Sequence, residues 1–250
     1  ADVIMVEEGG EPSGRRAEQA KGVASLQVGA GRVPRESPFY APNRNKRSIC
    51  LDLKHDEARQ AFYRLAEKSD VVLEGFRPGV THRLGIGYEA LSKLNPRIIY
   101  CALTGYGQDG PYRDLVGHDI NYISFAGALG ITGKANEGPT LPGFQLADFA
   151  GGGLHTVIGI LLALMARERT GRGQMVDISM TDGVMSFLST ILSDYLWSKR
   201  APARGQEMLN GGAPHYSIYE CKDGRYITVG SAEPWFYANL CRALGHEEFI

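Results

Sequence analysis

Two arginines flank a Pro-Gly turn and have the chemistry to bind phosphate oxygens. Arg77 and Arg83 stand on either side of Pro78-Gly79, just after a short apolar run that is typical of a strand. Guanidinium groups bind phosphate in bidentate fashion, so this spacing suits an anionic ligand. It equally suits two solvated surface arginines, and Lys54, after another strand-like run, has the same two interpretations. The usual dinucleotide and P-loop glycine motifs are absent, so side chains would hold any phosphate.

A histidine and an aspartate are the candidate acid and base. His118 lies between a glycine-punctuated loop and a helix start, where an imidazole reaches solvent or substrate. Asp148 precedes Gly151-Gly152-Gly153 and a long apolar helix, where unpaired amides favour a carboxylate and glycines admit a ligand. Both residues also suit helix capping. The local pattern leaves both interpretations open.

The other polar candidates fit structural roles. Glu233 precedes a helix that starts with Pro234, so capping is its default role. The five histidines besides His118 have no arrangement with a Ser or Cys nucleophile. The four cysteines lack metal-ligand or disulfide spacing, which predicts mostly buried, reduced thiols and no metal site.

The composition is that of an ordinary soluble globular protein. Of 250 residues, 43% are hydrophobic and 22% charged, and the formal net charge is −1. This balance gives no global electrostatic case for a nucleic-acid or membrane-surface partner. The longest apolar stretch, Val157 to Ala166, is too short to span a bilayer, so we expect no membrane insertion. No secretory signal is visible, and we expect a cytoplasmic location, with an organelle left open.

The elements that must position these groups alternate between strands and helices. The predicted strands are Ala1 to Glu7, Ser48 to Leu53, Asp70 to Glu74, Arg97 to Leu103 and Gln174 to Ser179. The predicted helices are Asp56 to Glu67, Tyr88 to Leu94, Leu154 to Arg167 and Met180 to Trp197. This order predicts an α/β fold with a doubly wound large domain, whose ligand lies beyond the carboxyl ends of the strands. The helix from Leu154 is apolar almost all round, which predicts that it is buried.

The last fifty residues indicate a second, smaller α/β domain. A polar, Gly-rich linker over residues 201–213 precedes a hairpin, Tyr216 to Glu220 with Arg225 to Val229, and a helix from Pro234. We therefore predict a large domain over residues 1–200 and a linker with the start of a small domain over residues 201–250. Because the chain opens on a strand pattern with no initiator methionine and no preceding element, we also expect the fold's first strand and helix to be missing. A helix from Pro234 is still under way where the sequence stops at Ile250, so we expect the small domain to be truncated.

Several segments, in one order along the chain, together resemble the family III CoA-transferases, the CaiB/BaiF superfamily, and most of all its α-methylacyl-CoA racemases. The matching segments are Ala1 to Ile4 with Val6-Glu7, Lys46 to Lys54, Glu74 to Val80 with Arg83 to Gly85, Thr104 to Pro111, Gly117 to Tyr122, Asp148 with Gly151 to Gly153, Gly173-Gln174 with Val176-Asp177, Gly211 to Pro214, Tyr219 to Cys221, Asp223 to Tyr226 and Glu233-Pro234. An ordered set over nearly the whole chain is far more specific than any single motif.

The resemblance implies an acyl-CoA site. It places Leu51, Asp52, Leu53 and Lys54 near the adenine, Gly75, Phe76, Arg77 and Arg83 at the phosphates, and Gly117, Asp119, Ile120, Asn121 and Tyr122 along the thioester. It also makes His118 and Asp148 the catalytic groups, with Glu233 contacting the histidine. Coenzyme A is then part of the substrate, and no other cofactor is expected. The interlocked dimers of the family imply a homodimer.

Three functions are compatible with this resemblance. Inverting a carbon α to a thioester needs a base on one face and an acid on the other, roles that His118 and Asp148 fill in the racemase-like members. The sequence therefore predicts a racemase or epimerase of 2-methylacyl-CoA thioesters that works through an enolate. The alternative is a CoA-transferase in which Asp148 alone forms an acyl anhydride and then a CoA thioester. His118 favours the racemase, because the transferase needs no base there. A non-catalytic acyl-CoA-binding protein is the third hypothesis, and two filled catalytic positions speak against it.

One position departs from the family. The opening strand of family members usually continues to an arginine that helps to bind CoA, whereas this chain has Glu8 and glycines there. The basic loop from Arg15 to Arg35 is a candidate replacement.

Overall fold

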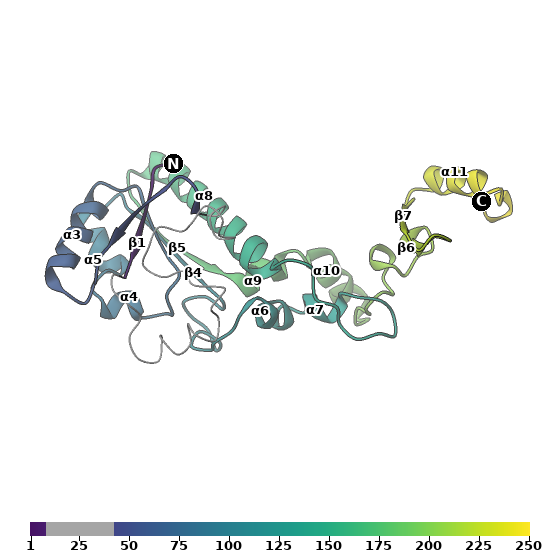
Figure 1. Ribbon diagram of the computed structural model, residues 1–250, viewed down its shortest axis with the longest axis horizontal. Coiled ribbons are helices and arrows are strands. Elements are labelled where there is room, and N and C mark those ends of the chain that lie inside the picture. The colour runs from purple at the N-terminus through teal and green to yellow at the C-terminus, as the bar shows by residue number, and fades with distance from the viewer. Residues whose placement is uncertain (9–42) are drawn as a thin grey trace. The chain divides into compact units, whose positions relative to one another are not determined.

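The computed structural model describes residues 1–8 and 43–250 (Figure 1). Strands and helices alternate along most of the chain, so the fold is mixed α/β, as predicted. The basic loop from Arg15 to Arg35 lies outside the described residues. The chain forms two compact units, which are described separately. The first comprises Ala1–Val72, Gly79–Tyr100 and Ala166–Met175, and the second comprises Leu73–Pro78, Cys101–Met165 and Val176–Ile250.

The first unit opens with two parallel strands, β1 (Val3–Glu7) and β2 (Lys46–Cys50). Helix α3 (Asp56–Glu67) follows with the predicted bounds, and it has acidic residues in its first turn, where the helix dipole favours them. Phe62 and Ala66 lie one turn apart on α3 and are buried, so the apolar face read from the sequence is the packed face.

Two short helices follow in this unit. The chain turns into α4 (Val80–Arg83) at Gly79, whose φ of 80° is readily available only to glycine. Helix α5 (Tyr88–Leu94) has the predicted bounds and buries Leu91 completely. Asn95 ends α5, and its side-chain amide donates to the backbone carbonyls of Ala66 and Ser69 at 3.2 and 3.0 Å. These bonds join the ends of α5 and α3.

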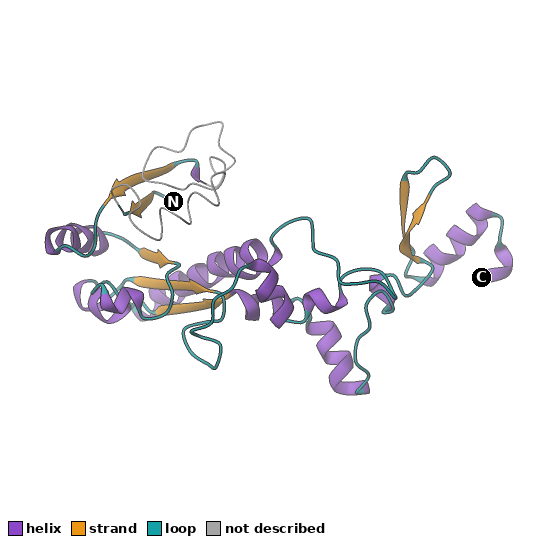
Figure 2. Ribbon diagram, turned by 60° about the horizontal axis from the view of Figure 1, so that its bottom comes forward, coloured by secondary structure: helices purple, strands orange, loops and turns teal. Residues whose placement is uncertain are grey.

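A three-stranded sheet passes through both units. Its order is β3 (Val71–Glu74), β4 (Ile99–Thr104) and β5 (Met175–Ser179), and the three arrows run the same way in Figure 2. The central strand, β4, is almost entirely buried, as an apolar run without alternation predicts for a strand covered on both faces. The boundary between the units crosses each strand, so their carboxyl ends belong to the second unit.

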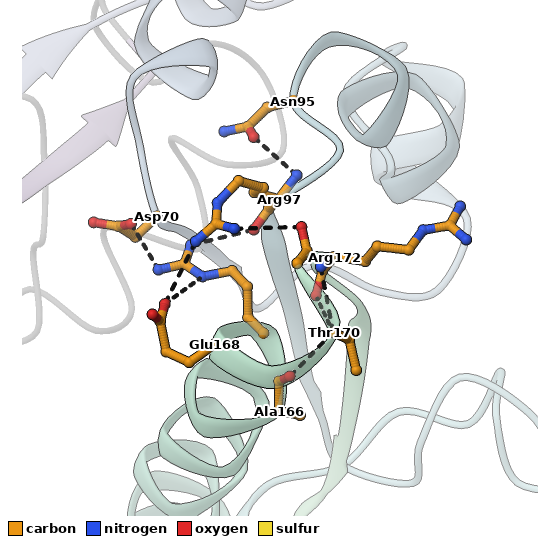
Figure 3. A network of polar contacts seen from close by, with 9 residues as sticks. Asp70, Asn95, Arg97, Ala166, Glu168, Thr170 and Arg172 are labelled. Carbon is orange, nitrogen blue, oxygen red and sulfur yellow. Dashed lines mark hydrogen bonds and ion pairs between the residues drawn. The ribbon is translucent and has the colours of Figure 1, made fainter.

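A network of ion pairs and hydrogen bonds, in which Figure 3 labels Asp70, Arg97 and Glu168, lies where these strands begin and includes a buried arginine. Arg167 is 8% exposed, and it pairs with the Asp70 carboxylate at 2.9 Å and donates to the Arg97 carbonyl at 3.2 Å. Arg97 in turn contacts Glu168 at 3.4 Å and the Gly171 carbonyl at 3.4 Å. Three segments distant in sequence thus meet at one charged group.

The second unit contains most of the described helices. Those before the final hairpin are α6 (Asp119–Phe125), α7 (Ala128–Ile131), the π-helix η1 (Ala147–Leu154), α8 (His155–Thr170), α9 (Met180–Ser186) and α10 (Ser189–Ser198). The last residues of α8, from Ala166, belong to the first unit. A small core joins α6, α7, η1 and α9 through the buried side chains of Ile123, Ala126, Ala128, Ala147 and Val184.

The end of the chain has the predicted hairpin. Strands β6 (Tyr216–Glu220) and β7 (Tyr226–Gly230) pair antiparallel, with Ile218 opposite Thr228. Helix α11 (Pro234–Leu244) follows, and short 3₁₀ turns lie at Met208–Asn210 and Glu247–Phe249. The predicted division into domains over residues 1–200 and 201–250 is not tested by these observations and stays a prediction.

The prediction that the long apolar helix is buried is wrong for one face of α8. The exposed side chains, each more than half accessible, are Val157, Ile158, Leu161, Leu162 and Met165, together with Leu154, the last residue of η1. With η1, this helix spans Ala147–Thr170 at a mean hydropathy of 1.8, long and apolar enough to cross a membrane by length and composition alone. A core helix of a soluble protein meets the same criterion, and Arg167 fixes the end of this one in the ion-pair network.

Two further expectations need correction. The helix predicted from Met180 to Trp197 is broken into α9 and α10 at Phe187-Leu188, which no sequence signal marks. Cys101 and Cys241 are buried but Cys50 and Cys221 are exposed, so only half of the thiols fit the expectation of burial. Burial, with a smaller contribution from Glu74, raises the pKa of the Cys101 thiol to about 11, which leaves it uncharged and unreactive.

Candidate active site

His118 sits at the start of α6 with its imidazole exposed. Its backbone is extended, with φ −134° and ψ 176°, and its carbonyl accepts the Asn121 N–H at 2.8 Å. The Asn121 side chain accepts the His118 N–H at 3.0 Å in return. Capping is thus carried by the His118 backbone and the Asn121 side chain, which holds the histidine at a fixed place on the helix end.

Asp148 is the second residue of η1, and it does not act as its cap. The N-cap position is Leu146, which makes no side-chain hydrogen bond there. The cap comes instead from α6: Asp119 Oδ2 accepts the N–H groups of Ala147 at 2.6 Å and of Asp148 at 3.1 Å. The N-cap interpretation of Asp148 is therefore wrong, and its carboxylate is exposed rather than folded back onto the helix.

The surroundings of Asp148 disfavour its charge. Partial desolvation raises the pKa of the Asp148 carboxyl, the neighbouring Asp119 charge raises it further, and His118 lowers it. The two predicted catalytic groups therefore lie close enough to influence each other electrostatically. A carboxyl that is easier to protonate than usual is better suited to act as an acid in a proton transfer.

Four aromatic rings line the neighbourhood of α6. Tyr106 contacts Tyr122 and Phe125 edge to face, with ring centroids 5.2 and 5.5 Å apart, and Tyr112 lies 5.0 Å from Phe125. The Tyr122 hydroxyl donates to the Gly117 carbonyl at 2.6 Å. Burial raises the pKa of Tyr122, as do Tyr106 and Asp148, whereas Arg77 lowers it. Tyr122 thus lies within electrostatic reach of both a predicted phosphate ligand and a predicted catalytic group.

Glycines near the site make room for neighbouring protein atoms. A Cβ added at Gly105 would overlap the Tyr122 ring, and one at Gly151 would lie 2.6 Å from the Met180 carbonyl. A Cβ at Gly183 would in turn overlap the Gly151 backbone. Where the sequence suggested that the glycines of η1 admit a ligand, the structure places α9 against Gly151 and Gly152. Helix η1 is therefore held by α6 on one side and by α9 on another.

The remaining predicted CoA ligands divide between the two units. Gly75, Phe76 and Arg77 follow β3 in the second unit and are exposed, and the Phe76 N–H donates to the Glu74 carboxylate at 2.7 Å. Arg83 is exposed on α4 in the first unit. Ile120 is exposed beside His118, in the second unit.

The predicted adenine-binding segment forms a compact turn in the first unit. Leu51 donates its N–H to the Glu7 carbonyl at 2.8 Å, the Asp52 side chain accepts the Lys54 N–H at 3.1 Å, and the Leu53 carbonyl accepts from Arg59 at 3.1 Å. Lys54 pairs with Glu8 at 2.8 Å. Glu8, which stands where family members usually have an arginine, is thus paired with Lys54, the lysine expected near the adenine.

Glu233 is the N-cap of α11, as its position before Pro234 suggested. It caps through its backbone carbonyl, which accepts the Tyr237 N–H at 3.0 Å, and its exposed side chain makes no capping bond. Its contact with the histidine stays a prediction. Among the described residues, no group of three or more His, Cys, Asp or Glu side chains is arranged to hold a metal ion.

Sequence reasoning missed the carboxylate role of Asp119 and three of the aromatic rings. Asp119 was expected along the thioester, and nothing in the sequence indicates that its side chain reaches residues 28 and 29 positions later. Phe125 stands three residues after Tyr122 on α6, a spacing that puts both rings on the same side of a helix and is visible in the sequence. Tyr106 and Tyr112 lie in an irregular loop, whose path no periodicity predicts.

The α/β fold thus carries His118 and Asp148 at the starts of two helices, where the histidine influences the ionisation of the aspartate. The chain matches CoA-transferase family III over residues 1–250, and it belongs to that family. The resemblance seen in the sequence is thereby confirmed.

Relatives of two activities share this similarity. Human α-methylacyl-CoA racemase is 46% identical over 208 residues, which are 81% of this chain and 53% of the human protein. The β subunit of succinyl-CoA–L-malate CoA-transferase from Chloroflexus aurantiacus is 37% identical over 211 residues, or 84% of this chain and 52% of the relative. The chain thus spans about half the length of the curated relatives it matches.

Solved structures agree on the fold. The crystal structure of a CaiB/BaiF family protein from Brucella suis matches with a TM-score of 0.77 and 31% identity, over 99% of this chain and 63% of that one. The predicted family III CoA-transferase fold is confirmed.

Proposed function

We propose that the protein is a racemase or epimerase that inverts the α-carbon of a 2-methylacyl-CoA thioester. The observation that carries the proposal is that His118 and Asp148 stand at the starts of two helices within electrostatic reach of each other: desolvation and the Asp119 charge raise the pKa of the Asp148 carboxyl, and His118 lowers it. Identity of 46% to human α-methylacyl-CoA racemase supports it.

The proposed reaction moves one proton off the α-carbon and another onto its opposite face. One group of the pair, as the base, takes the α-proton, and the electrons of the C–H bond pass to the thioester oxygen as an enolate. The other group, initially protonated, gives its proton to the opposite face while the enolate electrons return to carbon. The pair ends with its protonation reversed, and exchange with water restores it. Coenzyme A is part of the substrate, and we propose no other cofactor.

The CoA would be held by the predicted ligands. Arg77 and Arg83 offer guanidinium groups for its phosphates, and Gly117 to Tyr122 would lie along the thioester. Leu51 to Lys54 would approach the adenine, and Glu233 would contact the histidine. The aromatic rings beside α6 offer apolar surface for an acyl chain.

A CoA-transferase is the second candidate, because relatives such as the Chloroflexus aurantiacus β subunit have that activity. In this scheme Asp148 attacks the acyl-CoA and forms an acyl anhydride while CoA leaves as the thiolate. CoA then attacks the Asp148 carbonyl of the anhydride, which gives an enzyme thioester and frees the first acid. The acceptor acid takes up CoA through the reverse steps. A non-catalytic acyl-CoA-binding protein is the third candidate.

One experiment separates the three. The full-length protein is incubated with a single enantiomer of a 2-methylacyl-CoA in deuterated water, and optical purity and α-deuterium are followed. We expect racemisation with deuterium uptake, and we expect His118→Ala and Asp148→Asn each to reduce it at least about 100-fold, because both groups act on protons in transit. Transfer of CoA to succinate with hydroxylamine trapping at Asp148 and no deuterium uptake would establish the transferase. Binding of the acyl-CoA without either reaction would indicate a non-catalytic acyl-CoA-binding protein.

We also propose that the full-length protein is a cytoplasmic homodimer that binds no nucleic acid and does not insert into membranes. The exposed apolar face of α8 supports the dimer, since a second copy would remove that surface from water. Cell fractionation of the tagged protein tests the location, and recovery in the membrane fraction would contradict it.

A further inference from the structure

Asp119 joins the two candidate catalytic residues by its position in the chain and by its side chain. It follows His118 directly and begins α6. Its Oδ2 accepts the N–H groups of Ala147 and Asp148, at 2.6 and 3.1 Å. The residue is therefore covalently linked to one candidate and hydrogen-bonded to the backbone of the other.

The N-cap residue of η1 cannot replace the two hydrogen bonds that Asp119 accepts. The first N–H groups of a helix have no partner inside it, and Leu146, the N-cap of η1, supplies none from its side chain. Ala147 is fully buried, so its amide is shielded from water while the Asp119 side chain is in place. Loss of the Asp119 carboxylate would leave a buried donor without a partner, and the start of η1 would shift.

The charge of Asp119 acts on the same target. The Asp119 charge opposes ionisation of Asp148, whereas His118 promotes it. The side chain thus influences both where Asp148 lies and when it holds a proton.

We infer that Asp119 is a positioning residue, whose carboxylate fixes the backbone of Asp148 relative to His118 by accepting both hydrogen bonds at the start of η1. This inference rests on the proposed function, since a two-base reaction requires a fixed distance between the groups on the two faces of the substrate. A displacement of about 1 Å is enough to lower a rate about 100-fold.

Two variants separate the hydrogen bonds from the charge. Asp119→Asn keeps an acceptor oxygen but loses the charge, and Asp119→Ala loses both. In the full-length protein, we expect Asp119→Ala to lower kcat about 100-fold with KM changed less than about threefold. We expect Asp119→Asn to keep most of kcat and to shift the acidic limb of its pH profile to lower pH, because the charge that opposes ionisation of Asp148 is gone. Asp194→Ala, which removes an exposed carboxylate of α10, is the control.

Hydrogen exchange of peptides covering residues 145–150 supplies a measurement independent of activity. We expect Asp119→Ala to lower amide protection there by about tenfold and Asp119→Asn to preserve it. If the wild-type protein has no racemase activity but Asp119→Ala still loses amide protection, the proposed function is wrong and the positioning of η1 by the Asp119 hydrogen bonds is still supported. Unchanged protection and unchanged kcat in Asp119→Ala would overturn the positioning role, as would an Asp119→Asn pH profile identical to wild type. If Asp119→Ala fails to fold, the pH profile of Asp119→Asn decides.

Discussion

Asp148 is kept where its charged form is at a disadvantage, and this has a measurable effect on stability. Desolvation and the Asp119 charge place its pKa in the folded protein above the value in the unfolded chain. Folding therefore favours the protonated carboxyl. Stability from this group is present below the unfolded pKa and is lost as the pH rises through the folded pKa.

A neutral side chain in place of Asp148 should not lose stability as the pH rises. We expect Asp148→Asn to be more stable than wild type at pH 7, by less than about 1 kcal/mol because the side chain is exposed and solvent screens it. The difference should shrink as the pH falls toward the ordinary range of an aspartic acid. Chemical denaturation at several pH values measures it. A variant less stable than wild type at pH 7, or a gap that widens on acidification, would contradict the assignment.

At single residues, the local pattern left the roles of His118 and Asp148 open, and only the ordered family resemblance made them catalytic candidates. The structure shows that His118 influences the ionisation of Asp148, and their catalytic roles stay predictions. Asp119 could not be assigned its hydrogen bonds, because they depend on how α6 meets η1, a tertiary contact. The packing of Gly151 against α9 was hidden for the same reason.

At the level of elements, the crossing of η1 and α9 is a contact of backbone on backbone. Gly151 and Gly183 meet there, and a Cβ on either one would collide with main-chain atoms of the other helix. Main-chain atoms cannot rotate aside as a long side chain does. The crossing therefore tolerates no side chain, and it sets how far η1 lies from α9.

This contact predicts different outcomes for two similar substitutions. We expect Gly183→Ala to destabilise the protein by about 3 kcal/mol, because the added methyl forces the helices apart. Gly153→Ala is the matched control, since its Cβ would meet only the Asp148 carbonyl at 3.4 Å, and its stability should stay within about 1 kcal/mol of wild type. Thermal unfolding compares the two. Equal stabilities would show that the crossing is looser than described.

Elements with strong local signals were predictable and those shaped by packing were not. Helices α3 and α5 begin and end where periodicity and flanking residues indicated. The π-helix before α8 is shaped by its contacts with α6 and α9, which the local sequence does not show, and the break between α9 and α10 has no local signature either. The prediction that α8 is buried was wrong for one face, because an apolar sequence does not show which other surface, if any, covers the helix.

For the whole molecule, the α8 face makes the prediction about assembly testable. We expect Leu161→Lys in the full-length protein to convert the proposed dimer to monomer, because a charge cannot be buried unpaired in an apolar interface. Thr170→Lys adds the same charge at a polar position of the same helix and should leave the dimer intact. Light scattering with size-exclusion chromatography reads the mass. A dimeric Leu161→Lys protein, or a monomeric wild type, would refute the proposal.

The discontinuity of the first unit has a consequence for synthesis on the ribosome. Arg167 emerges 97 residues after its partner Asp70 and 70 residues after Arg97, so the ion-pair network cannot close while the intervening chain is being made. During that interval β4 has left the ribosome without β5, and its edge is open to wrong partners. Translation speed between these positions thus governs how long the nascent chain is vulnerable, and slowing it would lengthen the period in which a chaperone is needed.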